Sequence, residues 1–407
     1  MQVGIQVNSL PENQIQETVL GAIPIDWEVL TLGEVCLQIC DGTHFTPTYV
    51  EAGVPFYSVE NVTRRDFENV KYISHQEHAS LIKRCKPEKG DILMTRIGSI
   101  ADTTLIDWDV DASIYVSLAL LKVNDRADPS YIYAYSKSKA FVQGAESRSL
   151  MNAVPKKINM CEIASILLAV PISKIEQVKI AEALSDVDAL IEALEKLIAK
   201  KRLIKKGAMK ELLTGKRRLQ GFSREWKQSS IAEVADCLDN LRVPLNSVQR
   251  ADMEGQYPYC GANGVLDYIN DYCLDDDVIL MAEDGGYFDE YETRPIAYRM
   301  TGKIWVNNHA HILKAKKFFD NGFLYYSLVH KNILPFLASG TRAKLNKSEL
   351  NKIEINHPPM IDEQMEISSV LSCLDSELGA IETKLAKARR IKQGMMQQLL
   401  TGRIRLV

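Results

Sequence analysis

A stretch of this chain occurs twice, and this internal repeat constrains the fold more than any other feature. Residues 171–219 align without a gap with residues 358–406, at a constant offset of 187, and 22 of the 49 positions are identical. Both copies begin at a proline and end in the string LLTG, at 212–215 and at 399–402. Each copy follows a longer region that differs between the halves. The repeat therefore predicts two related halves with pseudo-two-fold symmetry.

Both copies are predicted to be long amphipathic helices. Apolar residues recur in alternating steps of four and three, which is typical of a coiled-coil seam. These residues are Ile180, Leu184, Val187, Ile191, Leu194 and Ile198 in the first copy, and Ile367, Leu371, Leu374, Leu378, Ile381 and Leu385 in the second. A helix from residue 180 to residue 213 would be about 50 Å long, so it needs a partner, and the other copy supplies one in an antiparallel arrangement. Gly215 and Gly402 are placed to end the helices. The alternative is that each helix packs on its own head as ordinary core.

The regions outside the repeat predict two heads with mixed secondary structure, so the fold class is α+β. Short β-type runs at 92–94, 113–116, 278–281 and 303–306 lie between turn-rich stretches, and helical stretches follow near 131–145 and 323–337. Trp27 and Trp226 open the two heads at matching places, which predicts a role in core packing. The predicted order is an N-terminal tail at 1–23, a first head at 24–170, a central helix at 171–219, a second head at 220–357 and a C-terminal helix at 358–407.

Composition argues against a secreted or membrane-spanning chain. The eight cysteines form no CxxC pair, which favours reduced thiols in a cytoplasmic protein. The first residues lack the apolar core of a signal peptide, and no apolar run reaches the length of about 18 residues that a membrane helix needs. Formal charge is only −4, so any contact with DNA must come from local basic patches. One such patch, between Lys196 and Arg218, predicts partner docking together with a general positive field.

The sequence lacks the motifs of a self-sufficient enzyme. A phosphate-binding GxxxxGK[ST] loop is absent. The string NHPP at 356–359 is similar to the NPPY of amino-methyltransferases, but His357 interrupts it and no glycine-rich cofactor loop accompanies it. Cys36, Cys40 and His44 lack the second ligand pair of a structural zinc site. We predict no catalytic residue, no metal and no cofactor.

The arrangement of two diverged heads alternating with two similar helices resembles the specificity (S) subunit of type I restriction-modification systems, over nearly the whole chain. The first head carries strings typical of that family: DGTHFTP at 41–47, VPF at 54–56 and KGDILMTRIG at 89–98. The second head carries LDNLRVPL at 238–245, YPYCGANG at 257–264, EDGG at 283–286 and GTRAKLNK at 340–347. The first head lacks a clean counterpart of the last string and has ESRSLMN at 146–152 instead.

The resemblance implies that each head is a target recognition domain that reads one half of a bipartite, asymmetric site in double-stranded DNA. It also implies that the paired helices set the spacer and dock two methyltransferase subunits, and that a restriction and translocase subunit joins this core. Candidate DNA-binding residues are polar side chains in the loops of the family strings and nearby turns. In the first head they are Thr43, His44, Thr46, Arg64, Arg96, Ser99 and Arg148; in the second they are Arg242, Asn263, Asn307, Asn308, Thr341, Arg342, Lys344 and Asn346.

Two other functions compete with this hypothesis. A coiled-coil adaptor that binds only proteins would show no salt-sensitive binding to any duplex. A self-sufficient methyltransferase or nuclease is disfavoured by the missing motifs, and methyl transfer by the isolated chain would support it.

Overall fold

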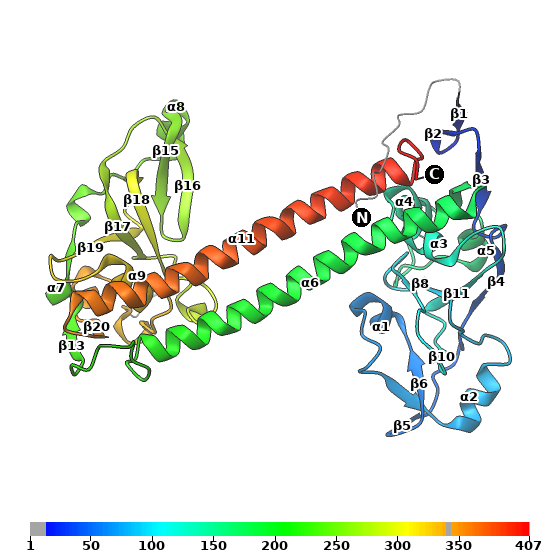
Figure 1. Cartoon of the computed structure of the whole chain (residues 1–407), viewed down its shortest axis with the longest axis horizontal. Helices are drawn as coiled ribbons and strands as arrows, with labels where there is room; N and C mark the ends of the chain where they lie inside the picture. Colours follow the sequence, from blue (N-terminus) through cyan, green and yellow to red (C-terminus); the bar gives the residue numbers. More distant parts are fainter. Residues whose placement is uncertain (1–13, 151, 339–342, 407) are drawn as a thin grey trace. The chain divides into compact units, whose positions relative to one another are not determined.

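The structure is a computed structural model of the chain, and it describes residues 14–150, 152–338 and 343–406 (Figure 1). The chain divides into two compact units. Unit 1 consists of Met1–Leu194 and Lys384–Val407, and unit 2 consists of Glu195–Thr383. Each unit therefore combines one head with a segment from each copy of the repeat.

Within its described residues, the head of unit 1 contains two four-stranded sheets and two separate strand pairs. The central sheet is antiparallel, with the order β4 (Cys36–Asp41), β11 (Leu118–Val123), β8 (Ile92–Thr95), β9 (Thr103–Leu105). The smaller sheet has the order β10 (Ser113–Ile114), β6 (Val54–Tyr57), β7 (Lys71–Ile73), β5 (Tyr49–Val50). The strand pairs are β1 (Ile15–Thr18) with β2 (Gly21–Pro24), and β3 (Trp27–Thr31) with β12 (Leu167–Pro171). The helices are α1 (Val59–Arg64), α2 (His75–Leu81), α3 (Pro129–Ser136), α4 (Lys139–Ser147) and α5 (Met160–Ala164).

The part of the unit 2 head that the structure describes contains one six-stranded sheet and one strand pair. The sheet has the order β14 (Ala235–Cys237), β19 (Ala310–Ala315), β17 (Leu274–Ala282), β18 (Ala297–Val306), β15 (Glu254–Gly261), β16 (Gly264–Ile269). β13 (Lys227–Ser230) pairs with β20 (Glu354–His357). The helices are α7 (Ile231–Val234), α8 (Ser247–Asp252), α9 (Asn321–Leu328) and α10 (Lys347–Leu350), with 3-10 turns at Asp239–Leu241, Phe288–Glu290 and Leu334–Phe336.

The two heads share the core of their main sheets. When the four shared strands are numbered by their order along the chain, their order across the sheet is 1-4-2-3 in both heads. These are β4-β11-β8-β9 in unit 1 and β14-β19-β17-β18 in unit 2, and all neighbours are antiparallel. The second of these strands is buried along the whole of β8 and from Val278 to Ala282 in β17, which fits a central strand covered on both faces there. The heads differ in the added strands, because β15 and β16 extend the main sheet of unit 2 while β5, β6, β7 and β10 form a separate sheet in unit 1.

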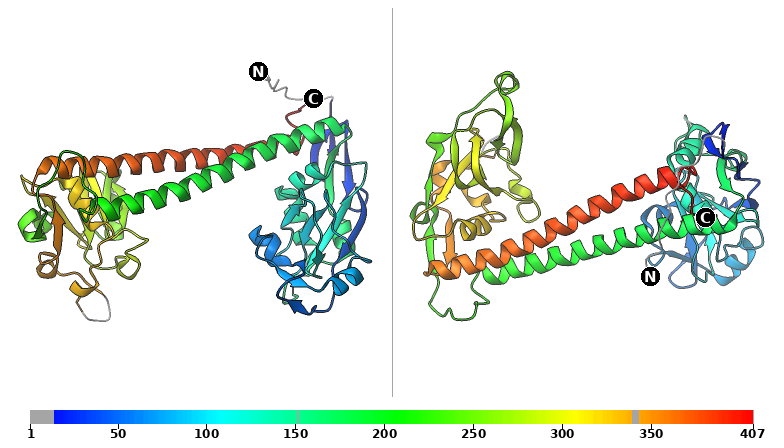
Figure 2. Two further views of the ribbon diagram at one scale, coloured as in Figure 1. Left: turned by 60° about the horizontal axis from the view of Figure 1, so that its bottom comes forward. Right: turned by 45° about the horizontal axis from the view of Figure 1, so that its top comes forward.

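Each copy of the repeat forms one helix of 39 residues, α6 (Lys174–Leu212) and α11 (Ile361–Leu399) (Figures 1 and 2). Every residue of the predicted seam is buried or partly buried. Within each unit the two helix segments run antiparallel: Lys392 pairs with Asp188 at 2.5 Å in unit 1, and Lys205 pairs with Asp375 in unit 2. Among the described residues, no helix has the length and apolar character needed to cross a membrane.

Two helical stretches differ from the sequence prediction. The stretch near 131–145 is two helices rather than one. Ser138 accepts a hydrogen bond from the Phe141 amide and so caps the N-terminus of a new helix, α4. The stretch near 323–337 is helical only as far as Leu328, and a 3-10 turn that contains Pro335 follows. Proline has no amide hydrogen to donate and favours such a break.

Four residues join the end of α11 to the start of α6 and to the head of unit 1. Gly402 has φ +68°, and a Cβ there would lie 2.4 Å from Pro24 and 3.2 Å from Trp27. Arg405 donates two hydrogen bonds, of 2.6 and 2.7 Å, to Glu176 at the start of α6, and Glu176 is almost completely buried. The indole nitrogen of Trp27 donates to the same carboxylate at 3.3 Å. Glycine is therefore required at residue 402 both for its φ and for the approach of the tryptophan.

Unit 2 repeats this arrangement with the equivalent residues, except that the buried indole nitrogen of Trp226 has no hydrogen-bond partner among the described residues. Gly215 has φ +69°, and a Cβ there would lie 3.1 Å from Trp226. Arg218 donates to both oxygens of the buried Glu363 at 2.7 and 2.8 Å. We call each set of glycine, tryptophan, arginine and glutamate a helix-end clasp. Trp27 is buried and Trp226 is partly buried, and both pack into the core of their head, as the sequence predicts.

The clasp makes a prediction for stability. Arg405→Ala leaves the buried Glu176 carboxylate without its cation, so the free energy of unfolding should fall by about 3–5 kcal/mol, as measured by urea denaturation. Arg403→Ala, an exposed neighbour, is the control and should change it by less than about 0.5 kcal/mol. Adding Glu176→Gln to Arg405→Ala should recover part of the loss. Equal effects of the two arginine variants would contradict the role of the clasp.

Candidate nucleic-acid interface

In unit 1, predicted site residues lie around the buried Asp41 at the end of β4. Asp41 accepts hydrogen bonds from Arg96 at 3.1 Å and from Arg84 at 2.5 Å. Arg96 follows β8 directly, and it also donates to the carbonyls of Val116 and Ile158. The Arg96 guanidinium is buried, with side-chain exposure of 9%, while that of Arg84 is exposed by 61%. Arg96 thus holds the strand ends together, and Arg84 presents a cation to solvent.

The loop after Asp41 carries the exposed side chains of this cluster. Gly42 is required here because a Cβ would lie 1.9 Å from the carbonyl oxygen of Ile114. Thr43 is buried, and its hydroxyl donates to the Phe45 carbonyl. His44 is exposed and its Nε2 lies 2.9 Å from Asp41, and Thr46 is exposed beyond it. His44 and Thr46 therefore form the accessible tip of the loop.

The other predicted residues of unit 1 lie apart from this tip. Arg64 is exposed in the last turn of α1. The Ser99 hydroxyl donates to Asp102. Arg148 is partly buried and donates to the Ser165 hydroxyl at 3.0 Å and to the Gly144 carbonyl at 2.9 Å, so its head group caps a helix end.

In unit 2, charged side chains form a network of ion pairs at the end of β17. Glu283 follows β17 directly and pairs with Arg242 and, at 2.9 Å, with Lys344. Arg242 also pairs with Asp239 at 3.2 Å. The Leu345 amide donates to the Glu283 carbonyl at 2.7 Å, which fixes this loop beside the strand.

Further loop residues of unit 2 meet at the same strand ends. Asn307 is buried, and its side-chain oxygen accepts from the His309 amide. The Asn263 side chain donates to the Gly285 carbonyl at 2.9 Å, so it stabilises a turn. Asn308 and Asn346 are exposed, and Lys344 is half exposed. Thr341 and Arg342 lie outside the described residues.

The two heads place charges of opposite sign at one equivalent position. Arg96 and Glu283 each follow the second strand of the shared sheet core, and each pairs with a residue that closes or follows the first strand, Asp41 or Arg242. An ion pair therefore joins the ends of the first two strands in both heads, but the strand register matches Asp41 with Asp239 rather than with Arg242. The strand ends thus present different donors and acceptors.

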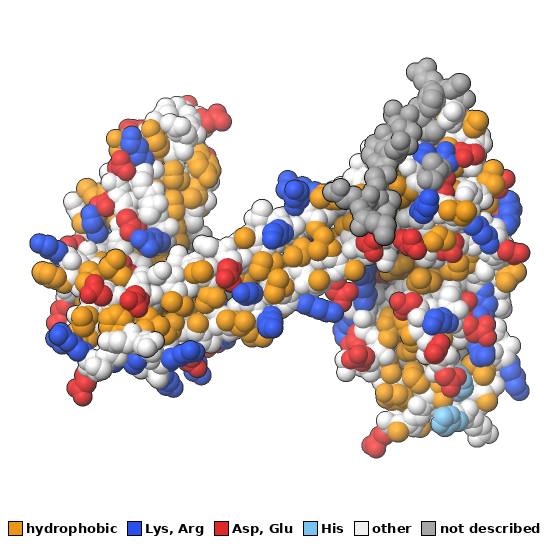
Figure 3. All heavy atoms as spheres, in the orientation of Figure 1, with side chains coloured by type: hydrophobic (Ala, Val, Ile, Leu, Met, Phe, Trp, Pro, Cys, Tyr) orange, Lys and Arg blue, Asp and Glu red, His pale blue; other side chains and the backbone are white. Residues whose placement is uncertain are grey.

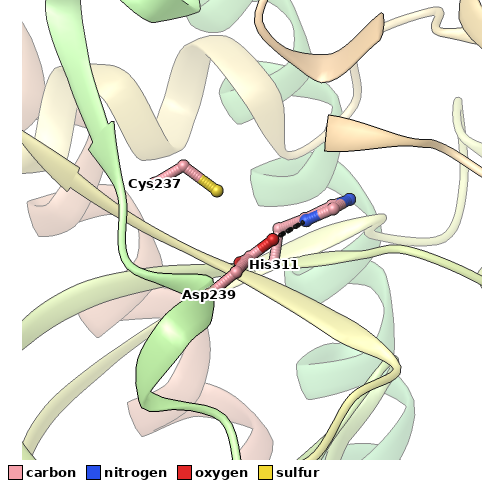
Figure 4. Close-up of side chains that lie close together, drawn as sticks. All are labelled: Cys237, Asp239 and His311. Carbon is pink, nitrogen blue, oxygen red and sulfur yellow. Dashed lines mark hydrogen bonds and ion pairs between the residues drawn. The ribbon is translucent and has the colours of Figure 1, made fainter. Parts of the chain in front are cut away.

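His311 forms the most buried ion pair of this network (Figure 4). Its Nδ1 lies 2.7 Å from Asp239, and its Nε2 lies 2.8 Å from the Leu345 carbonyl. Burial lowers the pKa of His311, but hydrogen bonds to Asp239, Cys237 and the Leu345 carbonyl outweigh it and raise that pKa to about 9. His311 is thus a cation that ties the loop at Leu345 to the sheet.

Cys237, Asp239 and His311 have the composition of a metal site, and their candidate ligand atoms lie within 4.8 Å of one another. Both ring nitrogens of His311 face acceptors, however, so the protonated ring has no lone pair for a metal. The geometry favours an ion pair over a metal centre.

The ion pair predicts a pH dependence. Because the pKa of His311 is raised in the folded state, its stabilisation is fully present below the ordinary histidine pKa of about 6.5 and is lost as pH rises through about 9. The loss should approach 3 kcal/mol, on the order of the pKa shift converted to free energy. Denaturation midpoints measured from pH 6 to pH 10 should fall for the wild type and for the His309→Asn control. A His311→Asn variant that kept the same fall would contradict this assignment.

Sequence reasoning missed three kinds of residue in these units. The first is the ion-pairing role of Asp41, Asp239 and Glu283, whose strings were singled out from the sequence for other reasons. The second is Arg84, for which no local pattern gave a signal. The third is the clasp, although its glutamates and arginines are identical in both repeat copies and could have been found there.

Comparison with known proteins identifies the family to which these heads belong. The model of the type I restriction modification DNA specificity domain matches the chain twice, at residues 24–201 and 223–389. The chain therefore belongs to the family of type I restriction-modification DNA specificity subunits, and this confirms the resemblance seen in its motifs.

Its relatives carry the same description. A putative type I restriction enzyme specificity subunit of Haemophilus influenzae is 40% identical over 156 residues, which are 38% of each chain. The putative MjaX specificity subunit of Methanocaldococcus jannaschii is 24% identical over 432 aligned residues, covering 97% of each chain. The crystal structure of the type I restriction-modification S subunit from M. genitalium has a TM-score of 0.66 at 16% identity and covers 98% of both chains, which shows a common fold.

Proposed function

We propose that this chain is the DNA-reading subunit of a type I restriction-modification complex and that each head reads one half of a bipartite, asymmetric site in double-stranded DNA. The observation that carries this proposal is the pair of heads with one sheet core and different strand ends. A shared core positions loops in the same way, and the loops then differ in hydrogen-bonding groups, which is what reading two different half-sites requires.

The accessible residues of each cluster are the candidates for DNA contact. In unit 1 these are His44, Thr46, Arg64 and, newly, Arg84. In unit 2 they are Asn308, Lys344 and Asn346, with Thr341 and Arg342 retained from the sequence. The buried or internally bonded residues Thr43, Arg96, Ser99, Arg148, Arg242, Asn263 and Asn307 would position the loops.

The long helices are proposed to pair as a coiled coil with pseudo-two-fold symmetry and to set the spacer between half-sites. Each helix runs without a break from one unit into the other, and its seam is buried or partly buried in both. The same helices would dock two methyltransferase subunits, and a restriction and translocase subunit would join that core. The chain itself would be non-catalytic, and methylation and cleavage in the cytoplasm would belong to the partners.

The proposal is tested by mapping modified adenines in a host that expresses the chain. Deletion of the gene should abolish methylation at one bipartite motif. Replacement of residues 24–170 by another head should change one half of that motif only. Methylation that persists at the motif after the deletion, or a change in both halves of the motif after the exchange, would contradict the proposal.

The exposed side chains give a reciprocal prediction. His44→Ala with Thr46→Ala should weaken discrimination in one half-site, and Lys344→Ala with Asn346→Ala in the other. The expected effect is about tenfold for each side chain that hydrogen-bonds to a base edge in the wild type. Sequence selection from random duplexes with the assembled methyltransferase measures both halves at once, so each variant is the control for the other. Equal loss of discrimination in both halves from either variant would contradict separate reading.

The helices give a prediction for spacing. Deleting one heptad from each copy, residues 193–199 and 380–386, shortens each helix by about 10 Å and preserves the seam. The spacer of the recognised site should shorten by about three base pairs, while both half-sites stay unchanged. Unchanged spacing with altered half-sites would contradict the role of the helices.

A further inference from the structure

Two free cysteines lie side by side next to the loop tip of unit 1. Cys40 is the penultimate residue of β4 and pairs with Leu120 of β11, so these two side chains lie on one face of the main sheet. Cys85 is buried in the apolar cluster that contains Leu120, and Cys40 packs against the same cluster. A hydrogen bond joins the two thiols. Their side chains therefore point toward each other, as a disulfide requires.

The backbone holds the two cysteines in different ways. Asp41 follows Cys40 and Arg84 precedes Cys85, and the two charged side chains pair at 2.5 Å. Cys40 is fixed by the sheet. Cys85 lies in an irregular segment between α2 and β8, where its amide and that of Arg84 donate to the Leu81 carbonyl at 3.4 and 3.2 Å. A bond between the sulfurs therefore requires adjustment of the irregular segment rather than of the strand.

Local charges make Cys40 the more reactive of the two thiols. The Cys85 thiol donates a hydrogen bond to Cys40 and lowers its pKa. The cations of Lys122 and Arg84 act in the same direction and, with that bond, outweigh the burial of Cys40 and the carboxylate of Asp41. Lysine and arginine side chains lie among acidic ones over the head of unit 1 (Figure 3), so near cations rather than a general positive field favour the thiolate.

The two thiols also differ in exposure. Cys40 is partly exposed, whereas Cys85 is buried. The hydrogen bond that Cys85 donates and its burial both raise the pKa of Cys85, so Cys85 keeps its proton. A thiolate that solvent can reach is the form that reacts with oxidants, and a second thiol beside it resolves the product. Cys40 and Cys85 match these two roles.

We propose that Cys40 and Cys85 are an oxidation site, in which hydrogen peroxide produces a disulfide that disturbs reading of the half-site bound by the head of unit 1. In the first step, the Cys40 thiolate attacks one peroxide oxygen and the O–O bond breaks. Cys40 becomes a sulfenic acid, and the hydroxide that leaves takes up the proton released by the Cys40 thiol. In the second step, the Cys85 sulfur attacks the Cys40 sulfur, the S–S bond forms and the S–O bond breaks. The hydroxyl group leaves with the Cys85 proton, so two thiols and one peroxide give one disulfide and two waters.

The disulfide acts on the candidate DNA contacts through neighbouring residues. An S–S bond is about 2.05 Å long, so its formation draws the sulfurs well inside their non-bonded contact distance. Cys85 moves, and Arg84 moves with it away from its pairing geometry with Asp41. The same carboxylate holds His44 at 2.9 Å. Oxidation therefore displaces the exposed side chains Arg84 and His44. This effect rests on the proposed function, whereas formation of the disulfide does not.

Peptide mapping tests the oxidation site directly. The full chain, assembled with its methyltransferase, is treated with hydrogen peroxide, alkylated, digested and analysed by mass spectrometry. We expect a linked pair of peptides that joins Cys40 to Cys85, and dithiothreitol should separate the pair. Cys85→Ser should stop the reaction at a Cys40 sulfenic acid, which dimedone traps. The matched control Cys161→Ser removes an exposed thiol of α5 and should leave the disulfide unchanged.

Sequence selection from random duplexes measures the consequence for DNA reading. Oxidation of the wild-type assembly should reduce discrimination in the half-site of unit 1 by about tenfold and leave the other half-site unchanged. Cys40→Ser and Cys85→Ser should read both half-sites as the reduced wild type does, before and after peroxide, which also shows that they fold.

The outcomes separate this inference from the proposed function. Peroxide treatment that leaves Cys40 and Cys85 unlinked would overturn the oxidation site. A Cys40–Cys85 disulfide with unchanged reading of the unit 1 half-site would overturn its effect on recognition. If the reduced wild type selects no bipartite site, the proposed function fails, and the peptide map still decides whether the disulfide forms.

Discussion

In each unit, a carboxylate at the start of one long helix is buried against an arginine that follows the end of the other. A buried carboxylate is costly unless a cation and further donors satisfy it, so Glu176 requires Arg405, and Glu363 requires Arg218. Because each pair joins the first repeat copy to the second, it allows the helices to run only antiparallel within a unit. The tryptophan that opens each head packs on the same arginine and glycine, so the clasp also fixes the head to both helices.

The heads show how one sheet core can present two different surfaces. Both heads place an ion pair across the ends of the first two strands, and the cation follows the second strand in Arg96–Asp41 but lies in the loop after the first strand in Glu283–Arg242. Such a pair keeps the strand ends in place without an unpaired buried charge, while the loops beyond them are free to differ. In unit 2 the protonated His311 adds a second tie, to the carbonyl of Leu345.

The two repeat copies retain the features through which the long helices meet each other. The glutamate, arginine and glycine of the clasp are identical in both copies. All six seam positions are apolar in both copies, although only Ile180 and Leu184 are identical to their counterparts, so the seam conserves apolar character rather than the individual side chains.

The sequence by itself determined the parts of the fold that depend on periodicity and duplication. The seam from Ile180 to Ile198, the terminal glycines and the family strings could all be seen, because helix spacing and turn chemistry are local properties of the chain. The break at Ser138 was missed, since a single capping serine competes with a continuous apolar pattern. Tertiary structure alone decided that Arg405 meets Glu176 across 229 residues, that Arg96 is buried while Arg84 and His44 face solvent, and that His311 carries a proton. These outcomes depend on which strand ends the sheet topology brings together and on how much water it excludes there, and neither is encoded in the spacing of residues along the chain.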